Sequence, residues 1–266
     1  GSIAEIKSTN DSLNSLITPN FLSNIKRKNI PNQDEFDNLT KFDSSKLIHI
    51  KGNYTYPNSK TPTLLDLDFS LIPGEKLLIK GKSGSGKSTL MDLLMGLITT
   101  DIYKNDFNNF FDRVAFRANC MHVPQSTFLI SGSIFSNITL ANFLNTNEKK
   151  NDALSKAFYY SQLACLDDIV KTKNDLLKQV GENGSFLSGG QKQRISIARA
   201  LYRESNYLFL DEATSAIDKS TEDRLLKKIF ENKKNSTIVT ISHGKGFDKF
   251  ADRVIKVDQN RILTME

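Results

Sequence analysis

The sequence predicts an α/β fold: a mostly parallel sheet covered by helices, with an added antiparallel β subdomain and an α-helical subdomain. Continuous apolar runs at 77–79 and 207–210, and the β-branched run at 237–241, are typical of strands that are buried on both faces. In the second half of the chain these runs alternate with segments whose apolar residues recur at helical spacing. Short strand-like segments at 47–50 and 64–72 precede the first helix and predict the antiparallel part.

The composition is that of a globular protein. Of 266 residues, 38% are hydrophobic and 25% are charged, which are ordinary fractions. The net charge of +6 comes from basic residues spread along the chain, so we interpret it as solvated surface. Cys120 and Cys165 lack metal-ligand spacing and fit a reducing compartment. No apolar run approaches the roughly 18 residues of a membrane span, and no signal-peptide pattern is present.

The first 45 residues are rich in Asn, Ser, Lys and Asp and carry no recognisable chemistry. Gly1 and Ser2 are interpreted as a tag remnant, residues 3–16 are predicted to form a short helix, and the remainder is interpreted as a linker. The pattern changes near residue 46. We therefore predict a linker over 1–45 and a folded domain over 46–266.

A glycine-rich stretch follows the apolar run at 77–79 and precedes a helix predicted to start near Lys87. It matches the phosphate-loop pattern G-x-x-x-x-G-K-S in the required strand–loop–helix order. Its glycines let backbone N–H groups converge, and the helix N-terminus adds its positive dipole end. We expect Lys87 to contact the β- and γ-phosphates and Ser88 to ligate Mg²⁺, whereas the alternative is a Gly/Ser loop without function. The predicted nucleotide-binding residues are Gly81, Lys82, Ser83, Gly84, Ser85, Gly86, Lys87, Ser88 and Thr89.

Two carboxylates, Asp211 and Glu212, directly follow the apolar run at 207–210. Neighbouring side chains at a strand end point in opposite directions, so the two acids can have different tasks. Asp211 could hold Mg²⁺, and Glu212 could polarise the water that attacks the γ-phosphate. The alternative is a pair of acids in a surface turn. Their place after a buried strand, downstream of a phosphate loop, disfavours that alternative.

The segment Leu187–Gln191 reads Leu-Ser-Gly-Gly-Gln and precedes an amphipathic helix. Ser188 and Gln191 fit a capping box, which is a purely structural helix start. Gly189 and Gly190 at the same helix N-terminus also suit a second anion site. The position about twenty residues before the Asp–Glu strand favours the anion site.

The remaining elements follow from periodicity. Helical patterns dominate the predicted helical subdomain, about 126–195, with helical segments expected at 152–163 and 166–170. Ser220 is predicted to cap the following helix. The chain is predicted to end in a β-hairpin around Gln259 and Asn260.

Taken together, these motifs resemble the nucleotide-binding domain of an ATP-binding cassette (ABC) transporter over residues 47–266. Leu187–Gln191 is the distinguishing signature of that family. The resemblance implies that Tyr56, rather than Tyr54, stacks on adenine. It also implies that Gln125 senses Mg²⁺ and the γ-phosphate and couples to a membrane domain.

Two further roles follow from the same resemblance. Ser215–Asp218 is similar to the loop that crosses the dimer interface, and this places Asp218 near nucleotide. His243 is similar to the switch histidine that contacts the γ-phosphate, so the implied catalytic residues are Glu212, His243 and Gln125. His49 and His122 have no such support and are interpreted as structural.

The resemblance is to the exporter branch, because residues 125–138 and 180–184 are similar to its characteristic segments. It implies hydrolysis of ATP, with Mg²⁺, that powers export. It also implies a head-to-tail homodimer or heterodimer in which each phosphate loop faces Ser188–Gln191 of the other chain. Transmembrane domains, from the same polypeptide, would place this domain at the cytoplasmic face of the cell membrane, and no nucleic acid partner is implied.

Some residues depart from the family pattern, and other functions stay open. Asn183 stands where exporters commonly have Arg, and 101–111 replaces the usual Gly-containing hairpin. One alternative is a non-transport ABC ATPase that acts on ribosomes or DNA. A second is a regulatory subunit that binds nucleotide without hydrolysing it. A phosphate-loop kinase would not need Leu187–Gln191.

Overall fold

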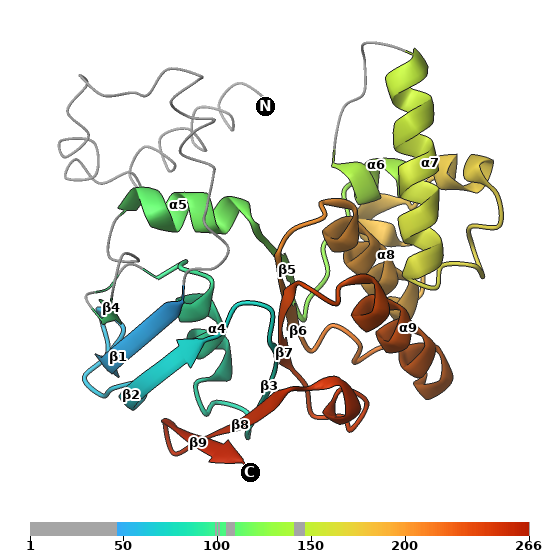
Figure 1. Ribbon diagram of the computed structural model, residues 1–266. Helices are drawn as coiled ribbons and strands as arrows, with labels where there is room; N and C mark the ends of the chain where they lie inside the picture. The colour runs from blue at the N-terminus through green and yellow to red at the C-terminus, as the bar shows by residue number, and fades with distance from the viewer. Residues whose placement is uncertain (1–46, 99, 101, 105–109, 141–146, 266) are drawn as a thin grey trace, which may run out of the picture. The chain divides into compact units, whose positions relative to one another are not determined.

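The computed structural model describes residues 47–98, 100, 102–104, 110–140 and 147–265 (Figure 1). The predictions for residues 1–45 therefore lie outside the described residues. Among the helices within these ranges, none combines the length and the apolar character needed to cross a membrane.

The central sheet of the described chain has six strands in the order β5-β6-β7-β3-β8-β9. Neighbouring strands pair in parallel except β8 and β9, which form the antiparallel hairpin predicted at the end of the chain. The mostly parallel sheet is therefore confirmed. The strands are β3 Lys76–Lys80, β5 Cys120–Val123, β6 Tyr207–Asp211, β7 Thr237–Ile241, β8 Arg253–Asp258 and β9 Arg261–Met265.

The continuous apolar runs are explained by burial of both sheet faces. Successive side chains of a strand point to opposite faces. In β3, Leu77 and Ile79 enter one apolar cluster, and Leu78 enters the other. Burying these side chains stabilises the fold by about 1.5–3 kcal/mol each. A charged residue at any of the three positions would lie in the core.

A smaller antiparallel sheet, in the order β2-β1-β4, covers one side of the central sheet together with the helix after the phosphate loop (Figure 1). Its strands are β1 Ile48–Tyr54, β2 Leu64–Leu71 and β4 Tyr103–Lys104. The antiparallel subdomain is thus confirmed, although its third strand comes after the first helix. That strand lies in the region where the sequence departs from the family pattern.

Helices α6 to α9 lie on the opposite side of the central sheet from α4 (Figure 1). Helices α6 to α9 therefore bury one face of the sheet, and α4 helps to bury the other. The α-helices are α4 Lys87–Leu94, α5 Phe110–Ala118, α6 Ile134–Thr139, α7 Asn147–Leu163, α8 Gly189–Tyr202 and α9 Lys219–Asn232. Short 3-10 segments lie at η2 Lys173–Leu177, η3 Glu182–Gly184 and η4 Asp248–Phe250.

Two local predictions were wrong. Residues 166–170 form a single turn and not a helix. The chain leaves α7 through Cys165 in the left-handed region (φ 57°), and Leu166 N–H then bonds back to the carbonyl of Ser161. The cap of α9 is Asp218, whose carboxylate accepts the backbone N–H of Thr221, and Ser220 donates its hydroxyl to Asp218 instead.

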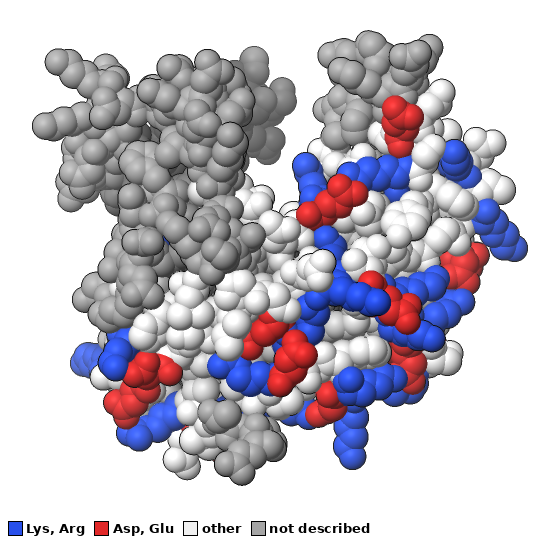
Figure 2. All heavy atoms as spheres, in the orientation of Figure 1, with Lys and Arg blue, Asp and Glu red and all other residues white. Residues whose placement is uncertain are grey.

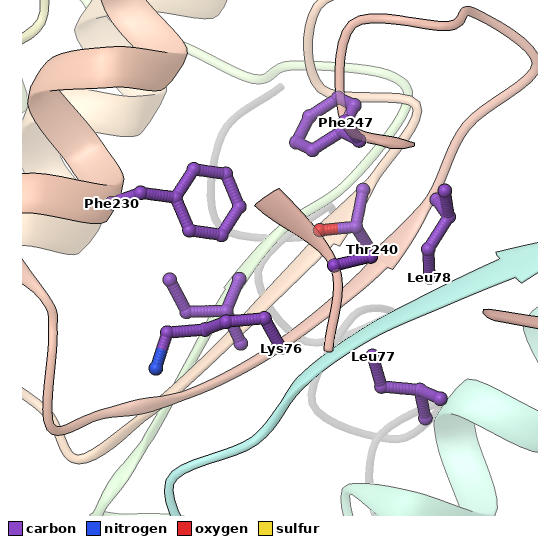
Figure 3. A pocket seen from close by; sticks show the side chains of 8 residues that line it. Lys76, Leu77, Leu78, Phe230, Thr240 and Phe247 are labelled. Atoms are coloured by element: carbon purple, nitrogen blue, oxygen red, sulfur yellow. The ribbon is translucent and has the colours of Figure 1, made fainter. Parts of the chain in front are cut away.

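Lys76 starts β3 as a buried cation. Its ammonium donates to the backbone carbonyls of Gly74, Lys234 and Ser236 at 2.7, 2.9 and 2.6 Å. Its aliphatic stem lines a small pocket with Phe230 and other apolar side chains (Figure 3). These bonds join the start of β3 to the segment that leads into β7, which helps to fix the strand that carries the phosphate loop.

Charged side chains of both signs are interspersed on the face seen in Figure 2. Charged residues also pair locally, such as Lys219 with Glu222 and Asp223, and Lys249 with Asp223. This arrangement is typical of a solvated surface.

Candidate functional site

The phosphate loop joins β3 to α4 in a tightly packed path. At Gly81 (φ 151°) a Cβ atom would lie 2.3 Å from the carbonyl oxygen of Val257. At Gly86 (φ 99°), the N-cap of α4, a Cβ would lie 2.8 Å from Leu64. Only glycine fits at these two positions, because both the backbone angle and the space exclude a side chain.

The loop surrounds a place suited to an anion. Lys87 is buried, and its ammonium donates to the carbonyl of Lys82 at 2.8 Å, within the loop itself. The hydroxyl of Ser85 is buried and has no hydrogen-bond partner among the described residues. The first turn of α4 leaves backbone N–H groups unpaired at the same point. A bound phosphate would supply acceptors for these donors.

Ser88 and Asp211, which are both predicted to bind Mg²⁺, contact each other. The Ser88 hydroxyl donates to Asp211 Oδ2 at 3.4 Å, across from the end of β6. Partial desolvation raises the pKa of Asp211, and the negative charge of Glu212 adds to this, while His122, Ser88 and Lys87 oppose it. Because Asp211 is partly desolvated, its negative charge is less well stabilised than in water, and a nearby cation would stabilise it.

Glu212 is contacted by two residues from neighbouring strand ends. Gln125 donates its amide to Glu212 Oε2 at 2.8 Å, and His243 Nε2 lies 3.2 Å from Oε1. Strands β5, β6 and β7 are parallel neighbours, so the residues just beyond their carboxyl ends meet at one edge. Glu212 itself has φ 46°, an unusual angle for a residue other than glycine.

The side-chain amide of Gln125 is bonded to Glu212. No described contact joins its amide to Ser88 or Asp211. The two carboxylates thus have separate surroundings, with Asp211 beside the phosphate loop and Glu212 beside Gln125 and His243.

The two candidate adenine-stacking aromatics differ in exposure. Tyr54 is buried, and its ring packs edge-on against Tyr56 at 5.1 Å between centroids. Tyr56 is 40% exposed, and its hydroxyl lies 3.2 Å from that of Thr89 in α4. Only Tyr56 offers an accessible ring face near the loop, which favours it for stacking on a base.

The segment Leu187–Gln191 starts α8 with a complete capping box. Ser188 Oγ accepts the N–H of Gln191 at 3.2 Å, and Gln191 Oε1 accepts the N–H of Ser188 at 2.9 Å. Ser188 and Gly189 are exposed, so this helix N-terminus remains open to solvent. Within the described chain no hydrogen bond or ion pair joins it to Gly81–Thr89. The two predicted anion sites therefore do not form one site within a single chain.

Sequence reasoning missed Gln193, which joins α8 to the predicted interface loop. Its amide donates to Ser215 Oγ at 3.0 Å and accepts the N–H of Ala216 at 2.9 Å. A Cβ at Gly190 would lie 2.8 Å from the carbonyl of Ala216, so the two segments are in direct contact. The long separation in sequence left no local signal for this pairing.

The two histidines interpreted as structural have different surroundings. His49 contacts Asp68 at 2.9 Å, on the antiparallel sheet. His122, in β5, interacts electrostatically with Asp211 and Asp92; desolvation lowers its pKa, and the two carboxylates oppose this. His122 thus lies close enough to Asp211 for the two side chains to influence each other's pKa.

Comparison with known proteins gives consistent matches. The family described as "ABC transporter" matches residues 64–215. The ATP-dependent lipid A-core flippase of Methylobacillus flagellatus is 35% identical over 215 residues, which are 78% of this chain and 36% of that protein. The lacticin-481/lactococcin-DR transport/processing ATP-binding protein of Lactococcus lactis is 34% identical over 240 residues, 88% of this chain and 33% of that protein. The chain thus spans about a third of the length of these relatives.

A solved structure matches as well. A bacterial Atm1-family ABC exporter with ATP bound superimposes with a TM-score of 0.69 at 27% identity, covering 81% of this chain and 37% of that one.

Proposed function

The chain belongs to the ABC transporter family, and we propose that it is the ATP-hydrolysing domain that powers export of a substrate across a membrane. The observation that carries this proposal is the set of contacts at Glu212: its carboxylate is contacted by both Gln125 and His243, and the neighbouring Asp211 faces Ser88 of the phosphate loop. A domain that only bound nucleotide would not need these three groups together. The named relatives are a flippase and a transport protein, which supports export over action on ribosomes or DNA.

The ABC fold binds ATP, and we propose the residues that hold it. Lys87 and the backbone N–H groups of the loop would take the β- and γ-phosphates, and Tyr56 would stack on adenine. The orphaned hydroxyl of Ser85 fits the same role. The other loop residues that we propose to line this site are Lys82, Ser83, Gly84, Gly86, Ser88 and Thr89.

Mg²⁺ fits the residues present. Ser88 and Asp211 supply hard oxygen ligands that already face each other, and the desolvated Asp211 carboxylate has no full positive charge bonded to it among the described residues. We propose these two residues as ligands, with the carbonyl oxygen of Gln125 as a third. When bound, the ion would neutralise charge on the phosphates.

Hydrolysis then depends on side chains that the sheet edge positions. Glu212 accepts the proton of the attacking water, because it directly follows Asp211, whose carboxylate faces Ser88 of the loop. Gln125 holds Glu212 through Oε2, and His243 holds it through Oε1. Gln125 and His243 can both turn to the γ-phosphate when nucleotide binds. Their contacts with Glu212 therefore depend on whether the γ-phosphate is present.

One chain supplies half of each working site. We propose a head-to-tail dimer in which Ser188–Gln191 of one chain closes on the ATP held by the other, with the dimer partner either identical or similar. The exposed N-terminus of α8 and its separation from the phosphate loop support this arrangement. Asp218 would lie at the dimer interface, since the loop before it packs against Gly190.

An apolar surface suits contact with membrane domains. Phe128 is 65% exposed, Ile130 37% and Phe186 74%. A Cβ at Gly184 would lie 2.8 Å from Leu129, so the segment after Gln125 lies against the loop at 180–184. We propose that this surface meets the cytoplasmic helices of transmembrane domains, which places the domain at the cytoplasmic face of the membrane.

Asn183 departs from the exporter pattern, and its backbone gives a reason. It has φ 46°, in the left-handed region that Asn tolerates better than most residues. Asn183 therefore suits the backbone conformation of this turn. We propose residues 46–266 as the ATPase domain, about 126–195 as its helical subdomain, and 1–45 as a linker.

Release of phosphate from ATP by the 266-residue chain tests the proposal. We expect Mg²⁺-dependent turnover that is lost with a chelator and lost in Lys87→Ala. Binding of ATP without any phosphate release, at every chain concentration up to the highest attainable, would instead support the regulatory alternative.

A further inference from the structure

Asp168 contacts the start of α8 from a turn that lies twenty residues earlier in the chain. Its Oδ2 accepts the amide Nε2 of Gln191 and the guanidinium Nη2 of Arg194, each at 2.9 Å. The turn is well fixed, because Val170 N–H bonds to the carbonyl of Leu166 at 2.8 Å. One carboxylate oxygen thus ties a rigid turn to two residues of the first turns of α8.

The contact with Gln191 decides which way the amide of that residue faces. A carboxylate can only accept hydrogen bonds, so Nε2 must point to Asp168. Oε1 is then left to accept the N–H of Ser188, which it does at 2.9 Å. Without Asp168 the amide could rotate by half a turn, and the capping box that shapes the start of α8 would lose one of its two bonds.

The contact with Arg194 neutralises a buried charge. Arg194 is 8% exposed, and the other acceptors of its guanidinium are the backbone carbonyls of Gly190 and Cys165. Asp168 is its charged partner among the described residues. A buried guanidinium that lost its only carboxylate would seek other acceptors, and it already reaches Gly190 at the anion-binding helix start.

From these contacts we propose that Asp168 is a positioning residue for the segment Ser188–Gln191. It does not touch nucleotide; it holds Gln191 and Arg194 so that the free N–H groups at the start of α8 face a triphosphate on a second chain. The inference rests on the proposed head-to-tail dimer, but the effect of Asp168 on the start of α8 can be measured in the single chain.

A neighbouring acid provides a matched control. Asp167, in the same turn, pairs with Arg224 of α9 at 3.1 Å and makes no described contact with α8. Asp167→Ala removes the same chemical group one residue away. Thermal unfolding of Asp167→Ala, Asp168→Ala and the unaltered chain shows whether each variant is folded.

The first measurement is hydrogen exchange of the backbone amides in the single chain. We expect Asp168→Ala to speed exchange at Ser188 and Gln191 by about ten-fold, the effect of losing hydrogen bonds to a charged group. Asp167→Ala should leave these amides unchanged. Should Asp168→Ala fail to fold, Asp168→Asn, which keeps the volume, should give a smaller change in the same direction. Unchanged exchange at Ser188 and Gln191 in the folded variant would overturn the inference.

The second measurement is dimerisation on ATP in a Glu212→Gln background, followed by sedimentation. Asp168→Ala should need about ten-fold more protein for half-dimerisation, while its affinity for a fluorescent ATP analogue as a monomer stays the same. Equal dimerisation of Asp168→Ala and its parent would contradict the positioning role. If the parent itself does not dimerise with ATP, the proposed function is what fails, and the exchange result still decides whether Asp168 shapes the helix start.

Discussion

Gln125 donates a 2.8 Å hydrogen bond to Glu212, although 87 residues separate them in the chain. The bond forms because β5 and β6 are parallel neighbours, and each of the two residues follows the end of its strand. His243 contacts the other carboxylate oxygen from the end of the next strand, β7. The edge of the sheet therefore brings Glu212 together with Gln125 and His243.

Replacing Gln125 by Ala tests that arrangement. Glu212 would lose one of its two partners, so we expect kcat for ATP hydrolysis to fall about 10- to 100-fold. The affinity of the single chain for ATP, measured without Mg²⁺, should stay within about two-fold, because the loop is untouched. Steady-state phosphate release and nucleotide titration measure the two quantities. An affinity loss as large as the loss in kcat would show that Gln125 acts in binding.

Lys87→Ala tests the phosphate loop. The ammonium is buried inside the loop, and a bound triphosphate would offer it charged acceptors. We expect the affinity for ATP to fall at least about ten-fold, measured by titration with a fluorescent analogue. Lys60→Ala, an exposed lysine on the loop between β1 and β2, is the control and should bind normally. Native affinity in Lys87→Ala would refute the binding site.

The glycines of the loop should differ in their tolerance of Ala. Gly81→Ala places a Cβ 2.3 Å from the Val257 carbonyl and should cost about 2–3 kcal/mol or more in the free energy of unfolding. At Gly84 nothing lies within 4 Å, so Gly84→Ala should cost only about 1 kcal/mol for its left-handed angle. Urea unfolding of the two variants compares them. Equal costs would mean that the close approach at Gly81 is relieved by small movements.

Asp218 should make stability depend on pH. The hydroxyl of Ser220 and the N–H of Thr221 hold the pKa of this carboxyl well below its ordinary value of 3.8. The folded-state pKa is the lower one, so the contribution is fully present above about pH 4–5 and is lost as pH falls through the folded-state pKa. Asp218→Asn keeps a cap but cannot titrate.

The difference in urea midpoint between Asp218→Asn and the unaltered chain should therefore be largest near pH 6 and should shrink by pH 2. A difference that stays constant over this range would show that the charge of Asp218 does not contribute.

The sequence predicted those candidate site residues whose positions depend on strand ends and on the phosphate loop. Asp211 and Glu212 follow a buried run, and the G-K-S motif has a fixed place between a strand and a helix. Such positions can be predicted because a strand end dictates where the next side chain lies. The same reasoning gave the two faces of the sheet and the terminal hairpin.

The contacts that the sequence did not predict join segments that are far apart in the chain. Asp168 meets Gln191 and Gln193 meets Ser215 because helix α8 packs against separate turns, and no periodicity records that packing. The cap of α9 was misplaced by two residues, since Asp218 and Ser220 are both good caps and only the backbone path chooses between them. Strand β4 lies where the sequence carries no family pattern.

The most direct test of the account is phosphate release by Glu212→Gln, measured beside ATP-dependent dimerisation of the same variant. If Glu212 accepts the proton from water, turnover should fall at least about 100-fold, because an amide cannot serve as a base. ATP binding should be retained, and the ATP-bound dimer should persist or become more stable, since hydrolysis no longer opens it. Phosphate release at the rate of the unaltered chain would contradict the account.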